Sequence, residues 1–456
     1  MSSTLIRELP YSDDSASFMR ALSTFQMAAF LDSASHNGSN ARRDVLAAAP
    51  VAYLSVENGN FSCSENAKEL VNASTDSQEI LNCVRLLKQT FLPSSEYSPA
   101  NPIGATYHGA VIAYLGYPVL HSRSRFSIRD AFVGVYLWTL VVDHQLGSSS
   151  LRFHASCSQN YIDHIFAAIT AALQLPERGE FQLDSQFEQQ SSYELYAQAF
   201  RDIKARIDRG DCYQVNLTQC FKARGHGQPL AAYLKLRQAT TAPFSAYIDW
   251  GNGALLSLSP ERFVSLRGKE VLTQPVKGTR PRGVTDEEDA RLARELSLSE
   301  KDTAENLMIV DLLRNDLGQV CKTGSIDVNQ LFTIESYSNV HHMVSDVSGI
   351  LRDDLDALDL LESCYPGGSI TGAPKLSAMN IIQEVERDPR RVYCGTVFCW
   401  SAEGDFDSSI TIRSLLWQAD ELSCWAGGGI VADSDCAQEY QECFDKIGNI
   451  FRALQR

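Results

Sequence analysis

Residues 274–283 read Gln274-Pro275-Val276-Lys277-Gly278-Thr279-Arg280-Pro281-Arg282-Gly283, and the rest of the chain is organised around them. Just upstream, two short apolar segments, 263–266 and 271–273, flank a glycine-containing turn and predict a β-hairpin. Lys277 therefore lies just beyond a hairpin, between a proline that restricts the backbone and a glycine that lets a ligand approach closely. Taken alone, such a lysine is more often a solvated surface charge than part of a site.

Composition narrows the classes of protein that this chain can represent. Its 456 residues are 44% hydrophobic and 21% charged, which provides material for a large core in two or three domains or one intertwined unit. The net charge of −16 repels phosphate backbones, so nucleic acid is not expected as a partner. A small anionic substrate stays possible, because a local basic pocket can act against the global field.

The chain carries no pattern of secretion or membrane insertion. No apolar stretch is long enough to span a bilayer, and the first residues lack the apolar core of a signal peptide. The twelve cysteines are scattered and form no Cys-x-x-Cys pair, which indicates reduced thiols. We expect a cytoplasmic protein that does not bind membranes.

A polar stretch at 176–190 predicts a boundary between an N-terminal region, 1–180, and a second region, 191–456. In the first region, 109–117 and 133–143 are expected to be strands and 161–175 a helix. The second region begins with a capping box, Ser191 and Glu194, which predicts a helix start.

Several segments of the second region carry polar side chains at the period of a strand or a helix. Gln214, Asn216 and Thr218 share one face of a predicted strand that lines either solvent or a pocket, solvent being the more common case. Adjacent His341 and His342 lie on a strand and point to opposite sides, so at most one serves a given site. Further strands are expected at 392–400 and at 408–416, which carries Arg413.

Two carboxylate pairs lie at helical spacing. They are Asp302 with Glu305, and Glu439 with Glu442, each three residues apart and hence on one helix face. Such pairs are normally solvated, but together they could also form an oxygen-rich Mg²⁺ site. The glycine-rich segment 366–375 has P-loop spacing without the Lys-Ser/Thr pair, so it predicts carboxylate binding at a helix N-terminus rather than nucleotide binding.

From about residue 191 to the end, the chain resembles the chorismate-utilising enzymes. The matching motifs are 213–217, 259–263, 304–311, 367–375 and 426–429. The first half is similar, more weakly, to the N-terminal region of anthranilate synthase component I. The resemblance implies an α+β fold, with two large antiparallel β-sheets packed as a sandwich and helices outside. It also implies a Mg²⁺-dependent site for chorismate.

Two positions sort the members of this family. Members that activate water carry a lysine in place of Gln214, and anthranilate synthase carries an alanine in place of Lys277. The pair in this chain resembles the members that convert chorismate and ammonia to 4-amino-4-deoxychorismate, a precursor of 4-aminobenzoate and folate. The alternatives are an anthranilate synthase component I and a non-catalytic subunit that senses amino acids.

The resemblance also assigns roles. Lys277 is the covalent nucleophile, Glu261 the general acid and His342 the active-site histidine, so His341 is a bystander. The implied Mg²⁺ ligands are Glu305, Glu439 and Glu442. The implied substrate-binding residues are Gln214, Gly278, Thr279, Thr371, Arg413, Gly427, Gly428 and Gly429. With no amidotransferase motif in the chain, ammonia is expected from L-glutamine through a separate glutamine amidotransferase subunit.

Two departures from the family pattern concern ligand contacts. Relatives hold tryptophan in a pocket that Ser33, Pro243, Phe244 and Ser245 match, but Asn40 and Arg43 stand where aromatic residues are expected. We therefore predict weak or absent tryptophan binding. Phe398-Cys399 stands where relatives have a substrate-contacting tyrosine, which puts that contact in doubt.

Overall fold

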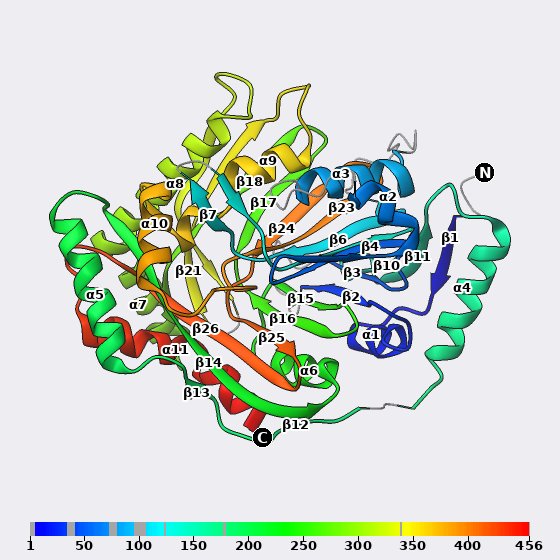
Figure 1. Cartoon of the computed structure of the whole chain (residues 1–456), viewed down its shortest axis with the longest axis horizontal. Coiled ribbons are helices and arrows are strands. Elements are labelled where there is room, and N and C mark those ends of the chain that lie inside the picture. Colours follow the sequence, from blue (N-terminus) through cyan, green and yellow to red (C-terminus); the bar gives the residue numbers. More distant parts are fainter. Residues whose placement is uncertain are drawn as a thin grey trace.

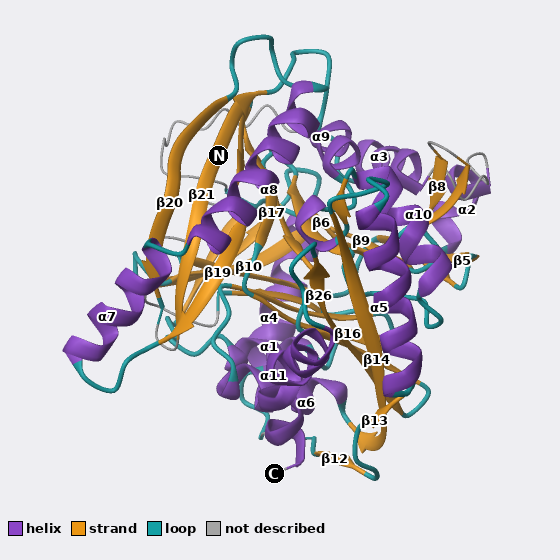
Figure 2. Ribbon diagram, turned by 90° about the vertical axis from the view of Figure 1, so that its left-hand side faces the viewer, coloured by secondary structure: helices purple, strands orange, loops and turns teal. Residues whose placement is uncertain are grey.

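Two large antiparallel β-sheets pack against each other, with helices on the outside (Figures 1 and 2). The computed structural model describes residues 5–33, 42–72, 80–94, 106–122, 125–176, 179–337 and 340–455. Within these ranges, sheet A has 13 strands and sheet B has 11. The predicted α+β sandwich is thereby confirmed. None of the helices described is long and apolar enough to cross a membrane.

Sheet A contains strands from both halves of the chain. Its order is β1 (Ile6–Leu9), β11 (Ser148–Phe153), β10 (Trp138–Asp143), β3 (Arg43–Ala47), β2 (Ala29–Asp32), β15 (Phe244–Asp249), β16 (Gly253–Ser259), β25 (Ser414–Gln418), β26 (Glu421–Ile430), β14 (Gln214–Gly227) and β12 (Phe181–Leu183). Two short strands, β13 (Glu188–Gln189) and β22 (Gly372–Ala373), also pair with β14.

Sheet B is built in the same mixed way. Its order is β19 (Val276–Pro281), β21 (Val340–Ile350), β18 (Glu270–Thr273), β17 (Arg262–Arg267), β24 (Phe406–Ile410), β23 (Thr396–Ser401), β6 (Ala110–Leu115), β9 (Ala131–Tyr136), β4 (Ala52–Glu57) and β5 (Asn60–Cys63), with β20 (Asp327–Ser336) paired to β21. A separate hairpin joins β7 (Val119–Ser122) and β8 (Arg125–Ser127). Each sheet thus mixes both predicted regions, and the boundary at 180–191 stays a prediction.

The helices cover the outer faces of the sheets. They are α1 (Ala16–Leu22), α2 (Lys68–Asn72), α3 (Ile80–Phe91), α4 (Gln159–Ala172), α5 (Tyr193–Asp208), α6 (Pro229–Ala239), α7 (Asp286–Ser297), α8 (Glu300–Gly318), α9 (Ala357–Cys364), α10 (Lys375–Val385) and α11 (Cys436–Gln455), with 3₁₀ turns η2 (Glu65–Ala67) and η3 (Gly368–Ile370). One apolar core lies between the sheets and under α3 and α9. A second lies between sheet A and the helices α1, α4, α5, α6, α10 and α11.

The chain changes sheets in the middle of two segments that were predicted as single strands. Residues 133–143 divide at Leu137 into β9 of sheet B and β10 of sheet A, and 408–416 divide before Arg413 into β24 and β25. A third change of sheet separates β16 from β17 at Pro260-Glu261. Both sides of each change are apolar because both sheets face one core, so hydrophobic pattern alone does not reveal the break.

Helix α5 starts later than predicted. Its N-cap is Ser192 with no side-chain capping bond, so the capping box at Ser191 is wrong. The predicted hairpin 263–273 is confirmed as β17 and β18, and Gly268 takes a positive φ of 59° in its turn.

Candidate active site

Lys277 lies on β19, the edge strand of sheet B, against β21 and helices α7 and α8 (Figure 2). The register between β19 and β21 shifts between Val276 and Thr279, at Gly278, whose φ is +84°. A Cβ on Gly278 would lie 2.8 Å from Leu296 Cδ1 and 2.9 Å from Asp302 Cγ. Glycine is therefore needed here both for the backbone conformation and for the close packing of the two helices.

The surroundings of Lys277 favour a neutral amine. Burial lowers the pKa of Lys277 and outweighs the nearby carboxylates of Glu305 and Glu261, which act in the opposite direction. The lysine is thus a partly buried group among carboxylates and not a solvated surface charge.

Glu261 occupies the change of sheet between β16 and β17 and is 6% exposed. Burial raises the pKa of Glu261 to about 7, against the stabilising influence of Lys277, the Ser369 hydroxyl and the Val276 N–H. The Ser369 hydroxyl donates to Glu261 Oε1 at 3.0 Å. Ser369 was missed from the sequence, although it lies inside the glycine-rich motif at 366–375.

The two histidines face opposite sides of β21, as predicted. Nδ1 of His342 lies 2.9 Å from the Thr279 hydroxyl, and burial together with the charge of Arg413 lowers the pKa of His342 to about 4. His342 is therefore neutral at pH 7. His341 instead contacts Asp289 at 3.0 Å and Ser336 at 2.7 Å, away from Lys277.

Gln214 and the glycines of β26 form a polar cradle in sheet A. Gln214 is 1% exposed, and its Nε2 has no hydrogen-bond partner within the described ranges. A Cβ on Gly429 would lie 2.8 Å from that Nε2. Asn216, on the same strand, is buried and donates to Ile370 O, so the solvent interpretation of this strand face is wrong for Gln214 and Asn216. The Thr371 hydroxyl is already engaged, since it donates to Gly367 O at 2.9 Å.

Arg413 stands where the chain passes from β24 to β25, with a φ of 51°. Burial lowers the pKa of Arg413, yet its guanidinium forms no ion pair with any residue that the structure describes. A partly buried cation without a counter-ion is suited to an anionic ligand.

The predicted metal ligands lie on two helices. Glu439 and Glu442 on α11 both face Gly428. A Cβ added to Gly428 would lie 2.9 Å from Glu439 Oε2 and 3.6 Å from Glu442 Oε1, so any larger residue would fill the space between the two carboxylates. Glu439 is held by the Ser434 hydroxyl at 2.7 Å, and burial and Glu442 raise its pKa. Glu305, on α8, faces Lys301 at 3.9 Å.

These carboxylates do not form a closed metal site. Across the described ranges, no group of three or more His, Cys, Asp or Glu side chains could hold a metal ion. Asp302 is unavailable because it pairs with Arg280 at 3.2 Å. Lys446, missed from the sequence although it lies four residues after Glu442, pairs with Glu442 at 2.6 Å and donates to Gly427 O at 2.8 Å.

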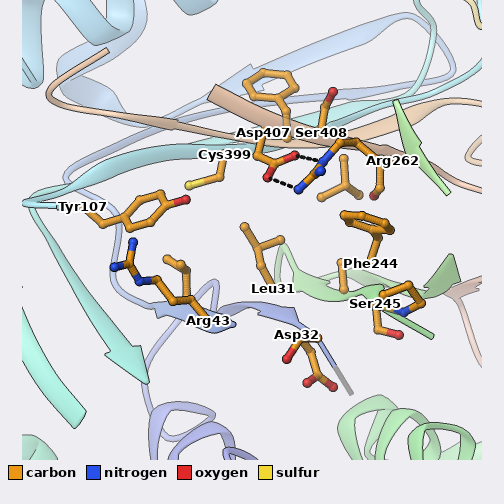
Figure 3. Close-up of a pocket in the computed structure, with 17 residues that line it drawn as sticks. Leu31, Asp32, Arg43, Tyr107, Phe244, Ser245, Arg262, Cys399, Asp407 and Ser408 are labelled. Carbon is orange, nitrogen blue, oxygen red and sulfur yellow. Dashed lines mark hydrogen bonds and ion pairs between the residues drawn. The ribbon is translucent and has the colours of Figure 1, made fainter. Parts of the chain in front are cut away.

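The predicted tryptophan-pocket residues meet in a separate cavity of about 100 Å³ (Figure 3). Ser33, Pro243, Phe244 and Ser245 all line it, together with Arg43. In Figure 3, Arg43 extends toward Tyr107, and its Nε donates to Asp143 at 2.7 Å. Asn40 lies outside the described residues. Phe398 and Cys399 also line this cavity, and Phe398 stacks on Phe406 with ring centroids 5.2 Å apart.

Residues 35–452 match the chorismate binding enzyme family. Since the match spans most of the chain, the chain belongs to this family. It is 38% identical to aminodeoxychorismate synthase component 1 of Escherichia coli strain K12, over 98% of each chain. It is 40% identical, over the full length of both, to the protein of the same name from Klebsiella aerogenes.

A solved structure extends the likeness to the fold. Anthranilate synthase component I from Streptococcus pneumoniae TIGR4 superposes with a TM-score of 0.73 and 27% identity, covering 92% of this chain and 94% of that one. The sandwich is thus shared with a relative whose name differs, so residues of the site must distinguish the activities.

Proposed function

We propose that this chain is component I of an aminodeoxychorismate synthase, which converts chorismate and ammonia to 4-amino-4-deoxychorismate in the cytoplasm. The observation that carries the proposal is Lys277, a lysine of lowered pKa beside a carboxyl of raised pKa. Full-length relatives of 38 and 40% identity that bear this name support it. The twelve free cysteines are in keeping with a reducing compartment.

Replacement of the C4 hydroxyl by ammonia proceeds in two displacements: Lys277 first displaces the hydroxyl, and ammonia then displaces Lys277. The neutral Lys277 amine attacks C2 of the ring while the double bonds shift, and the C4 hydroxyl leaves as water with a proton from Glu261. Ammonia then attacks C4, the double bonds shift back, and the C2–nitrogen bond to Lys277 breaks. The proton that ammonia loses restores Glu261, so one ammonia enters and one water leaves per turnover.

Other residues of the chain would hold the substrate. The guanidinium of Arg413, which has no ion pair among the described residues, and the Nε2 of Gln214 suit carboxylate and hydroxyl groups of chorismate. Glu439, Glu442 and Glu305 would hold Mg²⁺, which when bound neutralises a substrate carboxylate; two or three carboxylates with water and substrate oxygens suffice for this ion. Neutral His342 would orient Thr279.

The ammonia would come from L-glutamine through a separate glutamine amidotransferase subunit. The word "component" in the names of the relatives supports a second subunit. Free ammonia at alkaline pH should replace it in assays.

A covalent adduct tests the proposal directly. The wild-type chain is incubated with chorismate and Mg²⁺ but without ammonia, and its intact mass is measured. We expect a mass increase equal to chorismate minus water, located on Lys277 by peptide mapping and absent from Lys277→Ala. Anthranilate and pyruvate as products would instead favour the anthranilate synthase alternative, and no turnover would favour a non-catalytic subunit.

A further inference from the structure

A buried ion pair outside the residues discussed so far connects several parts of the substrate cradle. Glu386, at the end of α10, and Arg390, four residues later, approach within 2.7 Å, and their side chains are 6% and 1% exposed. Arg390 also lies over the ring of Tyr117, 4.7 Å from its centroid. Replacing such a pair with apolar residues is often neutral or stabilising, so stability alone does not account for it.

The hydrogen bonds of the pair go to the strand that carries Gln214 and to the η3 turn. The Arg390 guanidinium donates to Asn216 O at 2.8 Å and to Ile370 O at 2.9 Å. Glu386 Oε1 accepts from the backbone N–H of Thr218 at 3.0 Å and from its hydroxyl at 2.9 Å. The bonds to Asn216 and Thr218 lie on the edge of β14 opposite β26, and the bond to Ile370 holds the η3 turn.

The bonded strand positions lie directly across from the glycines of β26. Asn216 pairs with Gly429 and Thr218 with Gly427. Among the described strands, none pairs with this edge of β14 between β22 and β13. The ion pair contacts this part of the edge instead, and the Thr371 carbonyl accepts from the Asn216 N–H at 2.8 Å. The pair thus holds the backbone of β14 at Asn216 and Thr218, opposite the two outer glycines of the cradle. It also holds the η3 turn through Ile370 O.

We propose that Arg390 and Glu386 are positioning residues that set the geometry of the chorismate cradle formed by Gln214 and Gly427–Gly429. The inference rests on the proposed function for the identity of the ligand. The nucleophile lies on β19 and the acid lies between β16 and β17, whereas the hydrogen bonds described for the pair go to β14 and the η3 turn. Loss of the pair should therefore weaken substrate binding and leave the chemical step nearly intact.

The test separates positioning from stability. Arg390→Met alone leaves Glu386 buried and unpaired, so it should lower the unfolding temperature and raise the KM for chorismate. The double variant Glu386→Leu/Arg390→Met removes both charges and should recover most of the unfolding temperature. We expect its KM for chorismate, with saturating ammonia, to stay at least about tenfold raised, and its kcat to stay within about threefold of wild type, as loss of hydrogen bonds to charged groups implies.

Two further variants test the proposal even if Arg390→Met and the double variant fold poorly. Arg390→Lys retains the charge but lacks the planar fork, so KM should rise at near-native unfolding temperature. Arg391→Met is the matched control, because the Arg391 guanidinium pairs with Asp130 at 2.8 Å and donates to Gln418 at 2.9 Å, outside β14. A native KM in the double variant and in Arg390→Lys, or an equal rise in Arg391→Met, would overturn the proposal. Wild-type turnover is measured first, so failure of the proposed function itself is seen separately.

Discussion

The Lys277 site and the Figure 3 cavity are both polar, but they differ in how their charges are satisfied. In the cavity, Arg262 binds Asp407, Arg43 binds Asp143 and Asp32 binds Arg237. In the Lys277 site, Arg413 has no ion pair among the described residues and Gln214 Nε2 has no partner there. Buried polar groups are normally satisfied, so the unpartnered groups of the Lys277 site are suited to a ligand that supplies their partners.

The carboxyl of Glu261 provides the strongest test of this difference. Its pKa of about 7 leaves it a proton donor at neutral pH, a property that the paired carboxylates of the cavity need not have. Glu261→Gln removes the donor but keeps the shape, and we expect kcat to fall by about 10²–10⁴-fold. The measurement is steady-state turnover with chorismate and ammonia.

The pH profile gives an independent check on the same variant. Wild-type kcat/KM for chorismate, measured with saturating ammonia, should fall above about pH 7, because Glu261 then loses the proton that the departing hydroxyl needs. The falling limb should be absent from Glu261→Gln. If the fall of kcat/KM above pH 7 persists unchanged in Glu261→Gln, a group other than Glu261 loses the proton that causes it.

The family motifs in the sequence predicted the class of fold, and they named Glu261, Glu305 and Glu442, whose charges the structure places near Lys277. The sequence did not predict where strands change sheets: 408–416 has one apolar pattern but forms two strands, and Arg413 lies at the break. The strand pattern left solvent and pocket both open for the face of Gln214 and Asn216, with solvent the more common case, since a polar strand face looks the same over solvent and over a buried cradle. Contacts such as Ser369 with Glu261 depend on segments that only folding brings together.

The same substitution, arginine to methionine, can be made once in the Lys277 site and once in the Figure 3 cavity. Arg413→Met removes the cation that has no ion pair among the described residues, so the KM for chorismate should rise by roughly 10–100-fold, as expected for bonds to a charged group. Arg262→Met breaks the ion pair with Asp407 and should lower the unfolding temperature while KM stays within about twofold. A raised KM in Arg262→Met alone would show that pairing does not separate the two regions.

The affinity for Mg²⁺ should depend on the hydrogen bond that Ser434 donates to Glu439. Because the Ser434 hydroxyl orients this carboxylate, Ser434→Ala should weaken Mg²⁺ binding by about 10–100-fold, with the wild-type rate approached at high Mg²⁺. Calorimetric titration of Mg²⁺ in the presence of chorismate measures the effect. The control is Ser363→Ala, because the Ser363 hydroxyl donates to Leu360 O on α9, and no change is expected for it.

The smallest effect on turnover is expected for substitution of Arg43, which lies in the cavity of Figure 3 and is paired with Asp143. Protein purified without added amino acids should contain no tryptophan, because the cavity of about 100 Å³ is smaller than typical ligand sites of about 300–1,000 Å³ and carries an arginine. Arg43→Leu should leave turnover within about twofold and cost about 1–3 kcal/mol of unfolding free energy, since Asp143 loses one charged hydrogen bond. Asp143 keeps the backbone N–H groups of Gln145 and Leu146, which limits that cost. Tryptophan that co-purifies with the wild-type chain would contradict the assignment of this cavity as a satisfied, ligand-free region.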